Sequence, residues 1–268
     1  MINLRNCVAL ALLAAVAFAV PRSHAQEFAA VVSPPRFEIS VNPGERSRQV
    51  VEITNVSTQA SRYTLRTADW SLAPDGGVSF SDELVPGSCR PWVAIERREV
   101  VVPGGGRIRF RFELEPPADA PAGECRFALL IEGDEQTVQT AGGLNVPVSG
   151  RIAVIVYAGV RGGAPDLQLV GAAVIDANGR AMPALNVKNT GNAHGRLTGF
   201  LNGTDAKGRR LEFTPSTMPI LPGESRAITL NASDGSNEVA DVAFPVTISG
   251  MLEWGNARRV EINQQFAR

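Results

Sequence analysis

The sequence predicts an all-β protein, and three observations lead to that fold class. After residue 26, apolar and polar residues alternate in many short runs, and no amphipathic helical stretch of useful length occurs. Gly, Pro and Asn separate these runs at intervals of about 8 to 15 residues, which is the spacing of sandwich strands. A glycine-rich break at residues 159–165 leaves about seven runs on each side. We therefore expect two tandem immunoglobulin-like β-sandwich domains, residues 27–158 and 166–268, with 159–165 as the linker.

The first 25 residues have the three parts of a signal peptide. Arg5 supplies a positive charge, residues 8–20 (VALALLAAVAFAV) are apolar, and residues 23–25 (SHA) offer small side chains at the cleavage positions. The apolar part has only about 13 residues, whereas a membrane helix needs roughly 20. We expect cleavage before Gln26, export, and no integral membrane segment in the mature chain; a retained anchor is the alternative.

In the first half, the clearest strand is residues 107–115 (RIRFRFELE), where apolar and charged residues alternate without exception. Its arginines share a face with glutamates, which favours a solvated sheet surface over a polyanion site. Pro-Gly turns precede three such strands, in the stretches that begin at Asn42, Val102 and Leu221. The other runs of this half are RFEISV (36–41), SRYTLRTADW (61–70), PWVAIERREVVV (91–102), CRFALLIEG (125–133) and GGLNVPVSGRIAVIVY (142–157).

The second half repeats the same pattern of short strands and turns. Its runs are DLQLVGAAVID (166–176), ALNVKNTGN (184–192), GRLTGFLNGTD (195–205), RLEFTPS (210–216), RAITLNAS (226–233), FPVTISGMLEW (244–254) and RRVEINQQF (258–266).

Two cysteines, Cys89 and Cys125, remain after the signal peptide. An even pair in an exported protein indicates a disulfide, and two buried thiols are the alternative. Each cysteine lies at the start of an expected strand, and the antiparallel order places both starts at one end of the sandwich. This geometry favours the bridge.

Composition and motifs argue against an enzyme. The chain has 268 residues, 44% of them hydrophobic, with a formal net charge of −1, which gives no indication of nucleic-acid binding. No zinc, phosphate-loop or serine-hydrolase motif is present. His194 is the only histidine of the mature chain, and its turn-like surroundings indicate a surface residue. Acidic residues near turns lack metal-ligand spacing, so we expect no catalytic residue, metal or cofactor.

One alternating row is a candidate for contact with another protein. Leu144, Val146 and Val148 would share one face of a strand, and Pro147 suits a sheet edge because it lacks an N–H. The row continues at Ile152, Val154 and Val156, where we expect it to cover the protein's own core. Proteins usually cover an exposed apolar edge strand or use it to bind a partner. The expected mode of binding is β-augmentation, in which the strand pairs with a sheet of the partner.

Residues 28–158 resemble the periplasmic pilus-assembly chaperones, the PapD-like family. The resemblance lies in VVSPPRFEISVNPGERSRQVVEITNVSTQASRYTLRTADW, which is similar to the opening strands of that family, and in GRIAVIVYAGV, which is similar to the end of its long seventh strand. The second half is similar only to immunoglobulin-like modules in general. The resemblance implies a periplasmic location, pilin-like or other surface-fibre subunits as partners, and an outer-membrane usher as a further one.

The resemblance also implies site residues. The family donates its seventh strand to a subunit, and the candidate donor positions here are Leu144, Val146, Val148 and Ile152. Two basic residues of the family anchor the subunit's terminal carboxylate; Arg36 matches the first, and Ala153 replaces the lysine that is the second. Arg151 lies two residues away on the same face, about 7 Å along a strand, and is the candidate substitute. The alternative function is an exported two-domain binding or structural module that donates no strand.

Overall fold

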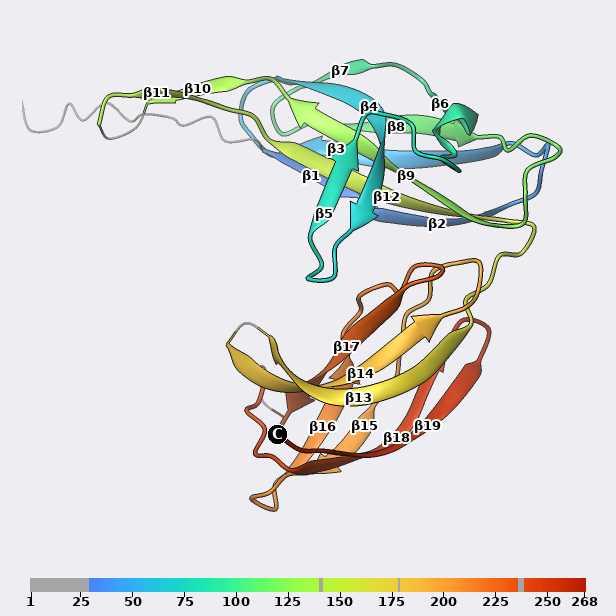
Figure 1. Ribbon diagram of the computed structural model, residues 1–268. Coiled ribbons are helices and arrows are strands. Elements are labelled where there is room, and N and C mark those ends of the chain that lie inside the picture. The colour runs from blue at the N-terminus through green and yellow to red at the C-terminus, as the bar shows by residue number, and fades with distance from the viewer. Residues whose placement is uncertain (1–28, 140–141, 178, 236–238) are drawn as a thin grey trace, which may run out of the picture.

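The computed structural model describes residues 29–139, 142–177, 179–235 and 239–268, and confirms the expected all-β fold of two sandwiches (Figure 1). In the described chain no helix is long and apolar enough to span a membrane. The first domain contains β1 (Ala30–Ser33), β2 (Arg36–Val41), β3 (Ser47–Asn55), β4 (Ser61–Leu72), β5 (Val78–Ser81), the 3₁₀ helix η1 (Arg90–Trp92), β6 (Val93–Ile95), β7 (Glu99–Val102), β8 (Arg107–Leu114), β9 (Gly123–Gly133), β10 (Gln136–Gln139), β11 (Asn145–Val148) and β12 (Arg151–Val160). The second contains β13 (Leu167–Ala177), β14 (Arg180–Asn189), β15 (Leu201–Thr204), β16 (Arg210–Pro215), β17 (Ser225–Ser233), β18 (Val246–Trp254) and β19 (Arg258–Phe266).

Two sheets enclose the core of the first domain. One has the strand order β1-β3-β8-β6, and the other has the order β2-β12-β9-β4-β5, with β7 also paired to β4. The alternation predicted for residues 107–115 is confirmed, because Phe110, Phe112 and Leu114 are fully buried between the sheets. Across the core, Phe112 packs edge-on against Phe127 of β9. The charged residues of β8 face outward, and Arg107 and Arg111 form ion pairs with Glu52 and Glu96.

The single strand expected over residues 91–102 is broken in the structure. β6 pairs with β8 in the first sheet, whereas β7 pairs with β4 in the second. Residues 96–98 cross between the sheets, and the backbone of Arg98 accepts a hydrogen bond from the N–H of Leu65 (2.8 Å). Three consecutive charged residues suit this exposed crossing, because the chain leaves the core there. Alternation alone does not show which sheet each half joins.

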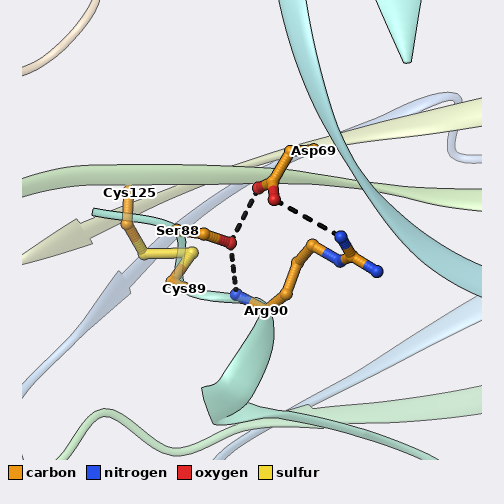
Figure 2. The surroundings of a disulfide bond; sticks show 5 residues. All are labelled: Asp69, Ser88, Cys89, Arg90 and Cys125. Carbon is orange, nitrogen blue, oxygen red and sulfur yellow. Dashed lines mark hydrogen bonds and ion pairs between the residues drawn. A yellow bond between two sulfur atoms is a disulfide. The ribbon is translucent and has the colours of Figure 1, made fainter. Parts of the chain in front are cut away.

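The disulfide between Cys89 and Cys125 is present, as the sequence favours (Figure 2). Cys89 is fully buried and directly precedes η1, and Cys125 belongs to β9, so the bond ties the segment before η1 to the sheet that contains β9. Beside it, buried Asp69 accepts a hydrogen bond from the hydroxyl of Ser88 (2.7 Å) and pairs with Arg90 (3.4 Å). The two cysteines are 36 residues apart, and closing such a loop contributes about 3–4 kcal/mol in the chain-entropy model.

β17 connects the two layers of the second domain. Its first half pairs with β14 and its second half with β16, so the strands follow one path, β13-β14-β17-β16-β15-β18-β19. Leu185, Phe213 and Ile248 are fully buried between the layers. This core is separate from that of the first domain.

A buried asparagine closes the same turn in both domains. Asn55 donates its side-chain amide to the carbonyls of Gln59 (2.7 Å) and Val102 (3.0 Å). Asn189 donates in the same way to Ala193 and Ile220, both at 2.8 Å. The carbonyls of Val102 and Ile220 both lie just before a Pro-Gly turn. The repeated turn plan of the sequence therefore corresponds to a repeated structural unit.

Candidate functional site

The β10–β11 hairpin extends beyond the end of the first domain (Figure 1). On β11 and the residue before it, Leu144, Val146 and Val148 expose 71%, 40% and 48% of their surface. Exposed aliphatic residues at alternate positions of one strand are unusual in a soluble protein when nothing covers them. The row that the sequence singles out is therefore accessible.

The exposed row continues into the core of the domain. Glu132 pairs with Arg151, and Gln136 pairs with Val148, so one strand advances four residues while the other advances three. Residues 134–135 and 149–150 lie between the two pairings and belong to no strand, and the backbone N–H of Gly133 donates to the carbonyl of Gly150 (3.1 Å), so the two segments stay side by side as β12 is followed back to β11. Beyond this junction Ile152 is half-buried and Val154 is fully buried. The expectation that the later part of the row covers the protein's own core is confirmed for Val154 and Val156, whereas Ile152 belongs to none of the described core clusters.

One edge of β11 and β12 has no neighbouring strand along most of its length. β2 runs parallel to β12, but its pairing begins only at Ile155, opposite Arg36. On that side, residues 145–154 have no paired strand within the part of the chain that the structure describes. Such an edge can accept a further strand through backbone hydrogen bonds.

Arg36 lies where this open edge ends. It is the first residue of β2, its side chain is half-exposed, and it forms an ion pair with Glu38 (Arg36 Nε to Glu38 Oε1, 3.0 Å). Both residues line a groove of about 480 Å³ between the two domains. The groove also includes Tyr157 of β12 and, from the second domain, His194 and Arg196.

Arg151 is not brought to Arg36. Arg36 lies opposite Ile155, four residues along β12 from Arg151, which is about 13 Å in a strand. The guanidinium of Arg151 instead pairs with Glu132, to which Arg66 also donates (3.1 Å). A hydrogen bond from Arg66, together with the charges of both arginines, lowers the pKa of Glu132 in spite of its partial burial.

The expectation that His194 is an ordinary surface residue is wrong. Its side chain is only 9% exposed, and its ring stacks on Tyr157 with 3.8 Å between ring centroids. Nδ1 contacts the buried carboxylate of Glu124, which also accepts the backbone N–H of His194 (3.1 Å). Burial raises the pKa of Tyr157. Through its contacts with Glu124 of β9 and Tyr157 of β12, His194 joins the second domain to the first.

Arg196 completes this interdomain contact. Its Nη1 lies 2.9 Å from Glu38 Oε1 and 2.6 Å from the Nε2 of His194. Its Nε donates to the carbonyl of Thr217 (3.1 Å), and its guanidinium lies over the ring of Tyr157. Sequence reasoning missed Glu38 and Arg196, and no local pattern marks either.

The cleft face of the second sheet carries a small apolar cluster. Ala68, Ala128 and Leu130 are buried there, and Trp70, Phe80, Ala153 and Ile155 pack against them. Ala153, which the sequence resemblance places at the position of the family's lysine, therefore belongs to an apolar surface. Within the described residues no group of three or more His, Cys, Asp or Glu side chains could hold a metal ion.

Solved structures resemble the chain over most of its length, whereas no family model and no curated protein matches its sequence. The YadV chaperone is 10% identical, with 88% of this chain and 98% of that one covered and a TM-score of 0.48. The class 5 fimbriae chaperone CfaA is 12% identical, with 89% and 99% covered and a TM-score of 0.46. A structure of Salmonella enterica SafA pilin in complex with the SafB chaperone is 12% identical, with 88% and 97% covered and a TM-score of 0.46. Each of these three solved structures contains a protein described as a chaperone.

Proposed function

We propose that this protein is a periplasmic chaperone that binds pilus or other surface-fibre subunits by donating its β11 strand to them. The observation that carries the proposal is the exposed row Leu144, Val146 and Val148 beside an open strand edge. A subunit that lacks one strand can pair with this edge and take the aliphatic side chains into its groove. Each such side chain contributes about 1.5–3 kcal/mol when it is fully buried.

The course of β11 and β12 supports donation rather than a simple exposed loop. Val154 is fixed in the core of the domain, so the strand that leaves the core has a defined direction. Ile152, half-buried at the junction, is the last candidate donor position. Arg36 lies just past the open edge, where a charged end of a bound strand could be held.

The experiment that tests donation is co-purification from periplasm with the wild type, Val146→Glu and Val101→Glu. Val101 is the matched control, because it is a valine on β7 of the same domain with 59% of its surface exposed. We expect the wild type and V101E to retain a partner and V146E to lose it, because a carboxylate cannot enter an apolar groove. A partner retained by V146E would contradict donation, and no partner with any variant would favour the non-donating module.

Arg151 remains the sequence-based candidate for a second anchor cation, and Arg151→Ala tests it in the same assay. Loss of the partner would support this role. Unchanged partner binding would remove Arg151 from the proposed site. In that case the charge of Arg151 serves only its ion pair with Glu132.

A further inference from the structure

The layer of β16, β15, β18 and β19 in the second domain (Figure 1) carries two rows of exposed polar side chains on its outer face. The residues between them, such as Phe213 and Ile248, fill the core. The strand register sets the rows: one is Glu212, Asn202, Ser249 and Asn263, and the other is Arg210, Thr204, Thr247 and Gln265. Six of these eight side chains end in an uncharged amide or hydroxyl, and such groups both donate and accept hydrogen bonds.

A groove of about 680 Å³ lies over this face. Residues 233–235, at the end of β17, line it on one side. Its floor includes four uncharged side chains, those of Asn202, Thr204, Thr247 and Ser249. In the described parts of the chain these four side chains take part in no hydrogen bond or ion pair. Their donors and acceptors are therefore available to a ligand.

The outer face of the first domain differs from this one. On β3, β8 and the turns beside them the charged side chains pair with one another, as Arg48 does with Glu113 (2.7 Å) and Arg46 with Glu115 (2.7 Å). Such a face satisfies itself and needs no ligand. The groove of the second domain is lined mainly by groups that lack an internal partner, which distinguishes it from an ordinary charged sheet surface.

An exposed aromatic ring stands at one end of the two rows. Phe200 directly precedes β15 and exposes 68% of its surface. Leu201 pairs with Gly250, so Phe200 and Met251 are the next residues along the two antiparallel strands and extend the outer face. Met251 is also exposed, at 44%. A ring this exposed beside hydroxyl and amide groups offers an apolar surface for stacking next to a hydrogen-bonding surface.

The geometry of the face favours a neutral sugar over other ligands. β15 is paired with β16 on one side and β18 on the other, so its backbone has no open edge for a peptide strand. Arg210 and Glu212 balance each other in charge, so the groove does not attract a polyanion. Sugar rings present hydroxyls around the edge and C–H groups on the face, which match the polar rows and the phenyl ring.

We propose that this groove binds a neutral oligosaccharide, with Asn202, Thr204, Thr247 and Ser249 hydrogen-bonded to its hydroxyls and Phe200 stacked on one of its rings. The outward positions from Phe200 to Thr204 span about 13 Å at the rise of a β-strand, which is the length of about three sugar rings. The site lies wholly in the second domain and is independent of the proposed donation of β11.

The test is a nuclear magnetic resonance titration of the backbone amides of full-length protein with three probes: maltotriose, cellotriose and chitotriose. Sorbitol is the control for a polyol without a ring. We expect saturable shifts confined to β15, β16 and β18 with at least one trisaccharide and none with sorbitol. Phe200→Ala should weaken the binding about tenfold through lost stacking, and Asn202→Ala about fivefold through lost hydrogen bonds.

The matched control is Asn256→Ala, which removes an exposed asparagine from the turn between β18 and β19, outside the groove. This variant should bind like the wild type. All three changed residues are exposed, so the thermal unfolding of each variant should match that of the wild type and exclude misfolding. No saturable shift with any of the three trisaccharides, unchanged binding by both F200A and N202A, or an equal loss in N256A would overturn the proposal.

Discussion

At the scale of single residues, Asp205 stabilises the turn between β15 and β16. Its Oδ1 accepts the backbone N–H groups of Lys207 and Arg209, both at 3.0 Å, and its Oδ2 accepts Nε of Arg209 (2.9 Å). Burial by itself raises the pKa of this carboxyl, but the hydrogen bonds from Arg209, Ala243 and Lys207 together outweigh it, so the pKa is lowered. The ionised form is therefore the stabilising one.

We predict that Asp205→Asn lowers the free energy of unfolding more at pH 7 than at pH 3. The native pKa lies below the ordinary value of about 3.9. The contribution is therefore complete above that value and is lost as the pH falls through the native pKa. Urea denaturation at both pH values measures the difference, with Asp134→Asn as an exposed control. An equal loss at the two pH values would show that the charge is not responsible.

The residues that sequence reasoning missed have partners far away in the chain. Glu124 lies 70 residues before His194, and Glu38 lies 158 residues before Arg196. Local context showed only a turn around His194, since the stacking on Tyr157 exists only once the two domains meet. Arg36, in contrast, is singled out by the family resemblance of its neighbouring residues, and its role stays a prediction.

At the scale of elements, alternation predicted strands well and sheet membership poorly. Residues 107–114 of the predicted strand 107–115 form β8 with one buried face, as period two requires. Residues 91–102 show similar spacing but divide between two sheets, because each half finds a different neighbour, β8 or β4. The row from Leu144 to Val156 is likewise continuous in sequence, and only the fold shows where its exposed part ends.

We predict that the two ends of this row differ in their effect on stability. Val154→Ala should lower the free energy of unfolding by about 1–3 kcal/mol, because it leaves a cavity in the core. Val148→Ala should change it by less than about 0.5 kcal/mol, since the side chain is half-exposed. Chemical denaturation of the isolated protein measures both. Equal losses would place Val148 in the protein's own core and remove the basis for donation.

At the scale of the whole molecule, side chains of the described residues connect the domains at two separate places. One is the cluster around Glu38, His194 and Arg196 near the linker. The other is the turn between β4 and β5, which reaches the second domain (Figure 1). There Arg226, whose side chain is 6% exposed, donates to the carbonyls of Ala73 (2.8 Å) and Pro74 (3.2 Å).

We predict that Arg226→Ala loosens the two domains without unfolding either. The lost hydrogen bonds connect the domains at one contact only, and both hydrophobic cores remain intact. Small-angle X-ray scattering should show a larger radius of gyration than for the wild type, whereas exposed Arg180→Ala should leave it unchanged. Unchanged scattering would show that the contact near the linker alone fixes the arrangement of the two domains.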